Sequence, residues 1–210
     1  MSPRPDVSEE RKSQILEAAV AVFAQQGFQE TRMDDIAQRA GLSKGALYLY
    51  YKSKDAIIAA LLQYFFSLEK QHLQTLLTVP GQRTVREQIL VLTQQLTATM
   101  KWMVALRPLA FEFYSIAGRQ KEVRQFLQDY YQDYCGELAT LIQRGIEQGE
   151  FRDVDPEAVA TTLVALYEGL ALLFFVDPQA ANWTQQIETS VQFLLAGIQM
   201  QEGPARTPTS

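Results

Sequence analysis

The chain has 210 residues, 47% hydrophobic and 20% charged, which is the composition of a globular protein able to bury a sizeable core. Its single cysteine excludes an intramolecular disulfide, and its single histidine excludes a histidine-rich metal site. The formal net charge of −5 is unevenly distributed: residues 1–55 contain eight Lys/Arg and eight Asp/Glu, whereas residues 56–210 contain eleven and sixteen. A neutral N-terminal part can still present a local basic face, whereas phosphate would repel an acidic C-terminal part.

The first predicted helix lies near the N-terminus. Apolar residues from Ile15 to Phe23 recur at the i, i+3, i+4, i+7 spacing of one buried helical face. Ser8 is expected to cap this helix and Gly27 to end it. The preceding residues have no apolar core of the kind that a secretory signal needs, so we expect a cytoplasmic protein.

Two short helices are predicted next. Thr31 and Asp34 resemble a capping box that opens the first of them. Gly41 breaks the chain, and Ser43 is expected to cap a further helix over about residues 44–51. Residues 1–54 are therefore predicted to form a three-helix domain.

Residues 55–202 are predicted to form about six more helices, and residues 203–210 a disordered tail. No segment alternates convincingly with period two, so the predicted fold class is all-α. Capping and breaking residues place the helices at about 54–79, 84–105, 107–118, 121–148, 156–176 and 183–200.

The helix over residues 156–176 is almost uncharged, with only Glu157 and Glu168 in it. Its length is close to the roughly 20 residues that span a membrane. Glu168, Gly169 and two threonines argue against a membrane span. We favour a soluble helix that is buried on two sides, by its own core and by a partner subunit.

Residues 31–54 predict a helix-turn-helix, in which the second short helix enters the DNA major groove. Gly41 accepts a positive φ at the turn, and Ile36, Ala37 and Leu47 can pack the two helices together. The side chains expected to point outward are suited to DNA: Ser43, Lys44, Gly45, Tyr48, Tyr50, Lys52 and Lys54, with Thr31 and Arg32 nearby. The alternative is an ordinary helical corner with half-buried tyrosines.

The runs ILEAAVAVFAQQGF and DDIAQRAGLSKGALYLYYKSK resemble the TetR family of bacterial regulators, and the resemblance is close across residues 11–62. It implies a three-helix DNA-binding head, a body of about six helices for ligand binding and dimerisation, and a repressor released from its operator by a small molecule. The phosphate contacts that it implies fall on Thr31, Ser43, Tyr48 and Lys54, and the groove-facing positions on Arg32, Lys44, Gly45 and Tyr50. The sequence departs from the family at Tyr50, where His is common, and at Tyr51, where Phe is common.

A ligand pocket in the body would be lined by large apolar side chains with a few hydroxyls. The candidates are Met100, Met103, Phe111, Tyr114, Tyr134, Tyr167 and Phe174, and the alternative is that they form solid core. Glu112 and Glu168 lie in apolar stretches, where they could meet a cationic ligand, solvent or a partner.

The last two helices are predicted to form a dimeric four-helix bundle. The interface residues would be Leu163, Leu166, Leu170, Val191, Leu194 and Ile198. A two-fold dimer matches a palindromic operator on double-stranded DNA, since its two heads must reach major grooves about 34–36 Å apart or a multiple of that. An effector that favours another head spacing would then release the DNA.

An enzyme is disfavoured because the sequence contains no HExxH, GxSxG, P-loop or CxxC motif. No cofactor, metal or membrane partner is expected. The remaining alternative is an activator, or a regulator that responds to a protein partner and has no enclosed ligand pocket.

Overall fold

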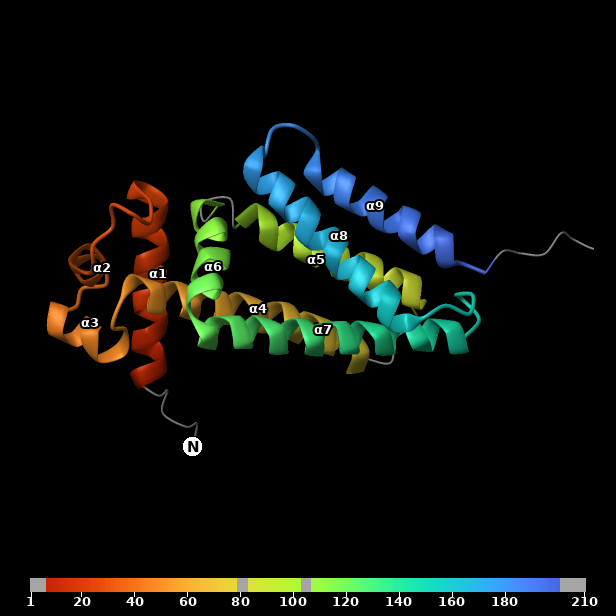
Figure 1. The fold of residues 1–210 in the computed structure, drawn as a ribbon, viewed down its shortest axis with the longest axis horizontal. Helices are drawn as coiled ribbons and strands as arrows, with labels where there is room; N and C mark the ends of the chain where they lie inside the picture. The colour runs from red at the N-terminus through yellow and green to blue at the C-terminus, as the bar shows by residue number, and fades with distance from the viewer. Residues whose placement is uncertain (1–6, 79–82, 103–106, 201–210) are drawn as a thin grey trace, which may run out of the picture. The chain divides into compact units, whose positions relative to one another are not determined.

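The computed structural model describes residues 7–78, 83–102 and 107–200. In these ranges the chain forms nine helices and no named strand (Figure 1). The helices are α1 (Val7–Gln26), α2 (Met33–Arg39), α3 (Lys44–Tyr50), α4 (Lys54–Thr78), α5 (Val85–Trp102), α6 (Arg107–Arg119), α7 (Lys121–Glu147), α8 (Pro156–Val176) and α9 (Trp183–Ile198). The prediction of an all-α chain with a three-helix head and a body of about six helices is confirmed.

Most helix ends have the local chemistry that the sequence predicts. Gly27 follows α1 with φ 81°, and Gly41 lies between α2 and α3 with φ 65°, in the left-handed region that glycine adopts without steric cost. The hydroxyl of Ser43 accepts a hydrogen bond from the backbone N–H of Ala46 at 3.2 Å. The carboxylate of Asp155 caps α8, accepting from two backbone N–H groups.

Two predicted caps are wrong. Ser8 lies inside the first turn of α1, because that helix begins at Val7. Arg32, and not Thr31, is the residue before α2, and the carboxylate that accepts its backbone N–H at 2.8 Å belongs to Asp35. The hydrogen bond from Arg32 lowers the pKa of Asp35, which keeps that acceptor ionised.

The chain divides into two compact units. Unit 1 comprises Met1–Glu69 with Lys101–Tyr130, and unit 2 comprises Lys70–Met100 with Tyr131–Ser210. Helices α4 and α7 each contribute residues to both. The domain boundaries predicted from the sequence, 1–54 and 55–202, remain a prediction, and the predicted tail at 203–210 lies outside the described residues.

The core of unit 1 holds α1, α2 and α3 together. Ile36, Ala37 and Leu47 are all buried, as the helix-turn-helix pattern predicts. The side-chain amide of Gln14 in α1 donates to the carbonyl of Ala40 at the end of α2, at 2.6 Å. The three helices therefore share one interior, and α3 is held by its inner face.

Helix α6 also belongs to unit 1. The amide of Gln29, in the loop after α1, donates to the carboxylate of Glu112 at 2.8 Å. At the C-terminal end of α6, Asp55 lies 3.6 Å from the guanidinium of Arg119 and accepts from the amide of Gln120 at 3.3 Å. The middle and the C-terminal end of α6 thus contact residues next to the helix-turn-helix.

In unit 2, α8 and α9 lie side by side, joined by a short loop (Figure 1). The loop before α8 contacts the start of α5 and the residues that follow α9. The carboxylate of Glu150 accepts from the first backbone N–H groups of α5, at Val85 (2.9 Å) and Arg86 (3.2 Å). Its carbonyl accepts from Met200 at 3.1 Å, and Phe151 and Gln199 form an isolated β-bridge.

Replacement of Gly145 by alanine is expected to destabilise unit 2. A Cβ there would lie 2.5 Å and 2.6 Å from two ring atoms of Phe151, whose side chain is only 2% exposed and cannot move aside easily. Overpacking costs about 1–3 kcal/mol, and the higher helix propensity of alanine offsets about 1 kcal/mol, so we expect a net loss of up to about 2 kcal/mol in the free energy of unfolding. Urea unfolding at fixed protein concentration measures it.

Gly136, in the same helix, is the matched control. A Cβ at that position would meet no atom within 4 Å. Gly136→Ala should therefore raise the free energy of unfolding by about 0.4–1 kcal/mol, because alanine restricts the unfolded chain. Equal effects of the two substitutions would contradict the packing described for Gly145.

Candidate nucleic-acid interface

Helix α3 has one buried face and one exposed face. Leu47 is buried and Tyr51, immediately after the helix, is buried against the head. Burial raises the pKa of the Tyr51 hydroxyl. Tyr51, which stands where Phe is common in the family, therefore packs as the core-side aromatic residue that the sequence predicts. The residues that face away from the core are Ser43, Lys44, Gly45 and Leu49.

Lys44 forms an ion pair with Asp34 of α2. Its ammonium lies 2.9 Å from one carboxylate oxygen, and both side chains are mostly exposed. The hydrogen bond to Asp34 raises the pKa of Lys44, so the side chain stays charged. An exposed pair of this kind contributes little to stability and is easily exchanged for another anion. Lys44 is thus a surface cation that can exchange its contact with Asp34 for a contact with a DNA phosphate or a base edge.

The other predicted contacts lie around α3. Tyr48 and Tyr50 are half-buried, and Gly45 is exposed with no atom within 4 Å of a Cβ placed on it. Lys52 donates to the carbonyl of Tyr48 at 2.5 Å, so its charge lies near the C-terminal end of the helix. Arg32 is exposed at the start of α2.

Thr31 has a different environment. It is buried, its hydroxyl donates to the carbonyl of Gly27 at 2.6 Å, and the amide of Gln26 donates to it at 3.4 Å. The structure gives this residue a role inside the head, where it holds the loop after α1. Its contact with phosphate remains a prediction.

Lys54 is also engaged within the protein. Its ammonium donates to the carbonyls of Phe28 at 2.5 Å and Gln29 at 3.0 Å, and it lies 4.5 Å from the centre of the Phe28 ring. Two carbonyl acceptors and an aromatic face bind a cation well. Lys54 therefore fastens the start of α4 to the loop after α1, and its predicted phosphate contact would have to compete with these partners.

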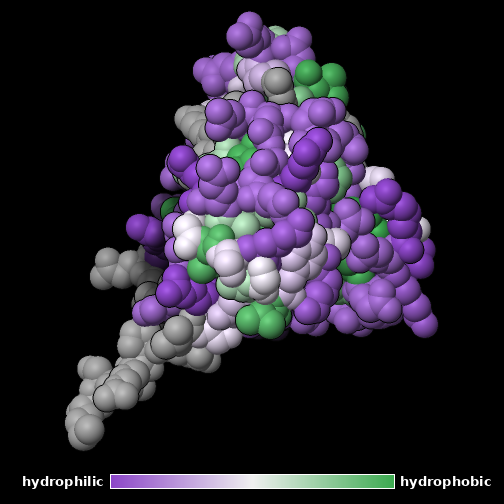
Figure 2. Space-filling view, turned by 90° about the vertical axis from the view of Figure 1, so that its left-hand side faces the viewer, coloured by the Kyte–Doolittle hydropathy of each residue, from purple (hydrophilic) through white to green (hydrophobic). Residues whose placement is uncertain are grey.

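One exposed residue of α3 was missed by the sequence reasoning. Leu49 is 77% exposed, although an apolar residue in a short helix is expected to face the core. The helical spacing of the sequence could have indicated this exposure, because Leu49 lies two residues from the buried Leu47 and so points the opposite way. From the side on which α2 and α3 lie, the surface is mostly hydrophilic with small separate hydrophobic patches (Figure 2).

The predicted ligand-pocket residues do not gather in one unit. Tyr134 and Phe174 are buried and Tyr167 is half-buried in unit 2, whereas Tyr114 belongs to unit 1 and is 54% exposed. Met103 and the side chains of Met100 and Phe111 lie outside the described residues. The pocket as a whole remains a prediction.

Polar groups within unit 2 pair with one another across helices. The hydroxyls of Thr93 and Tyr167 lie 2.8 Å apart, and burial raises the pKa of Tyr167 to about 12. The hydroxyl of Tyr131 donates to the carboxylate of Glu168 at 2.8 Å. Glu168 therefore has a hydrogen-bond partner within the protein, Tyr131. Glu112 likewise has Gln29, which lies in the loop after α1.

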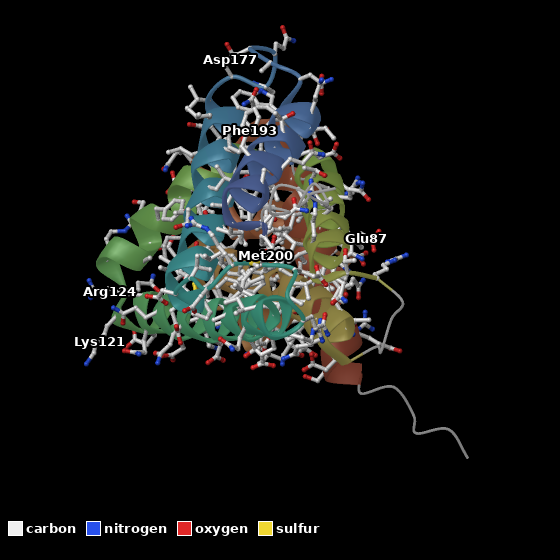
Figure 3. All side chains as sticks on the ribbon, turned by 90° about the vertical axis from the view of Figure 1, so that its right-hand side faces the viewer. Glu87, Lys121, Arg124, Asp177, Phe193 and Met200 are labelled. Atoms are coloured by element: carbon white, nitrogen blue, oxygen red, sulfur yellow. The ribbon has the colours of Figure 1, made fainter. Side chains whose placement is uncertain are left out.

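The predicted dimer-interface residues fall into two groups. Leu163, Val191 and Ile198 are buried within the protomer, while Leu166, Leu170 and Leu194 are half-buried. The large apolar side chains that do reach the surface of this helix pair and its ends are Leu172, Leu173, Val176, Phe193 and Met200, of which Phe193 and Met200 can be located in Figure 3. Helix α8 is apolar and long enough to cross a membrane, yet only 22% of its most apolar 18-residue stretch is buried.

Two family models match the chain. One, described as bacterial regulatory proteins of the tetR family, matches residues 15–61, and the other, described as the C-terminal part of BetI-type transcriptional repressors, matches residues 81–198. A Bacillus subtilis protein described as an uncharacterized HTH-type transcriptional regulator, YfiR, is 29% identical over 208 residues, covering 96% of this chain and 100% of the relative.

Solved structures share the fold. A TetR transcription regulator from Haloarcula marismortui superposes with a TM-score of 0.78 at 19% identity, covering 91% of this chain and 100% of that one. A structure titled as a SmeT–triclosan complex superposes with a TM-score of 0.73 at 21% identity, covering 96% of this chain and 98% of that one.

Lys54→Ala is expected to lower the free energy of unfolding by about 1–3 kcal/mol, because charged hydrogen bonds to two carbonyls are lost. The slope of log binding constant against log salt concentration should stay unchanged, since the ammonium is already occupied. Thermal unfolding and binding to a DNA duplex over a salt series measure the two quantities.

Lys52→Ala is the control, because Lys52 is exposed and close to the same surface. If Lys52 binds a phosphate, its loss should reduce the salt slope by about 0.9 with little change in stability. A reduced slope with unchanged stability in Lys54→Ala would instead make Lys54 the phosphate contact.

Proposed function

The chain belongs to the TetR family of bacterial regulators and is a DNA-binding transcriptional regulator, not an enzyme, and from this premise we propose that it is a homodimeric repressor. It would bind a palindromic operator through α3 and release it when a small, largely apolar effector binds the body. The observation that carries the proposal is the exposed outer face of α3 in a helix-turn-helix whose inner face is buried.

The DNA contacts that we propose come from the surface residues of the head. Lys44 and Tyr50 would contact base edges, while Ser43 and Tyr48 would contact the phosphates that flank the groove. Gly45 has no side chain, so the helix can approach the groove floor closely. The charge distribution supports this arrangement, because the acidic excess of the chain lies entirely after residue 55.

The dimer that we propose would bury the apolar surface of α8 and α9. Side chains as exposed as Phe193 (73%) and Leu173 (53%) on neighbouring apolar helices are unfavourable in water. A second copy of the chain supplies the same apolar surface, and a two-fold contact between the copies would bury both. The buried residues Leu163 and Val191 would then support the interface from within the protomer.

An effector would act on the body and move the heads. Helices α4 and α7 are paired in both units: the ring of Phe66 stacks on Tyr130 in unit 1, and Lys70 contacts Asp133 at 2.6 Å in unit 2. A change in unit 2 would therefore be carried to the start of α4, where Lys54 contacts the head. The proposal of an apolar effector is supported by the aromatic rings and neutral hydroxyls at Tyr134, Tyr167 and Phe174, and by the triclosan named for the SmeT neighbour.

The test of this function begins with selection of duplexes from random DNA by the full-length protein. We expect a palindromic site with two half-sites about one helical turn apart or a multiple of it. Small apolar compounds are then screened for release of that duplex, and a reporter gene behind the site shows the direction of regulation. Higher reporter expression with the protein would overturn the repressor, and failure of every compound would favour a protein partner as the signal.

Phe193→Glu is expected to shift the protein from dimer to monomer, because it would bury a carboxylate against its symmetry mate in each dimer. Sedimentation velocity at fixed concentration measures the change, and operator affinity should fall at least tenfold because one head alone makes half of the contacts. Tyr64→Glu, at a similarly exposed aromatic residue on α4, is the control and should leave the dimer intact. A Phe193→Glu protein that stays dimeric would place the interface elsewhere.

A further inference from the structure

The exposed leucine on α3 requires an explanation. Among the large hydrophobic side chains of the described ranges, Leu49 has the largest exposed fraction, 77%. Leu47, two residues before it, is fully buried. Residues two apart in a helix point about 200° apart, so Leu49 projects from the face opposite the core. The described residues leave most of this side chain uncovered, although water is an unfavourable surrounding for it.

The surroundings of Leu49 leave room for a flat partner to approach. Gly45 lies one helical turn before it on the same face. A Cβ placed on Gly45 would meet no atom within 4 Å, so this part of the helix surface has no side chain of its own. The exposed isobutyl group of Leu49 consequently has open space on the Gly45 side of the helix.

Two lysines are near Leu49 in sequence, Lys44 at the start of α3 and Lys52 just after its end. The ammonium of Lys44 is held by Asp34 at 2.9 Å. The ammonium of Lys52 is held by the carbonyl of Tyr48 at 2.5 Å. Both cations have polar partners within the protein, and the leucine itself can neither donate nor accept a hydrogen bond. Its contribution to recognition has to be apolar.

We propose that Leu49 contacts the 5-methyl group of a thymine in each operator half-site and so determines base preference there. In the major groove the base edges present hydrogen-bond donors and acceptors, and the methyl group of thymine is the apolar exception. The inference rests on DNA binding through α3 and is independent of repression and of any effector.

The test replaces single thymines by uracil in a duplex selected from random DNA by the full-length protein. This change removes one methyl group and leaves every hydrogen-bonding atom of the base in place. At one thymine position per half-site we expect uracil to weaken binding about fourfold, the effect of one buried methyl-sized group. Leu49→Ala should bind the thymine duplex more weakly and should lose the difference between thymine and uracil.

Two further variants separate apolar contact from a general loss of binding. Leu49→Met keeps an apolar side chain of similar volume and should keep the preference for thymine. Lys52→Ala should weaken binding to both duplexes equally. Thermal unfolding of Leu49→Ala should match that of the unaltered protein, because the side chain is exposed and its removal leaves no cavity.

Tight binding with the same affinity for thymine and uracil at every position would overturn the proposal while leaving DNA binding intact. A Leu49→Ala protein that still prefers thymine at the same position would overturn it as well, since another residue would then contact the methyl group. Failure to select any duplex would remove DNA binding itself, and the role of Leu49 with it.

Discussion

The recognition surface of this protein depends on the burial of one face of a seven-residue helix. A helix as short as α3 does not persist in water by itself, because too few backbone hydrogen bonds offset the cost of nucleation. Burial of Leu47, beside an α2 whose Ile36 and Ala37 are also buried, supplies the stabilisation that the backbone cannot. The exposed face of α3 is consequently a by-product of its buried face, and its direction is set by the core of unit 1.

The contacts around α3 extend that constraint into the body. Lys54 joins the start of α4 to the loop after α1, and Gln29 in that loop contacts Glu112 of α6. Asp55, the next residue of α4, contacts the C-terminal end of α6. The head therefore has a polar connection to two body helices. In the regulator proposed above, an effector in the body would displace these helices and alter contacts that surround the recognition helix.

Charge and apolar surface are separated along the chain in a way that fits such a regulator. The head is neutral overall and carries Lys44 and Lys52 at or just after α3, while the excess of acidic residues lies in the body. The largest apolar exposure of the body is on α8 and α9. The proposed DNA surface near α3 and the proposed dimer surface on α8 and α9 are thus different surfaces.

The sequence by itself determined the element order, most of the caps and the helix-turn-helix, because these depend on local chemistry. Gly41, Ser43 and Asp155 act on residues within a few positions of themselves, so their effect can be inferred from spacing alone. The resemblance of residues 11–62 to a known family is also a property of the sequence. It correctly predicted the family that the matches at 15–61 and 81–198 then showed.

The tertiary structure decided which side chains are available at the surface. Thr31 and Lys54 belong to a pattern typical of phosphate contacts, but distant carbonyls at Gly27, Phe28 and Gln29 accept their hydrogen bonds. Leu163 and Val191 have the spacing of an interface stripe, but the protomer buries them in its own core. Leu49 was overlooked because hydrophobicity predicts burial, whereas a short helix has only one buried face. In each case the outcome depends on partners remote in the chain, which local sequence cannot specify.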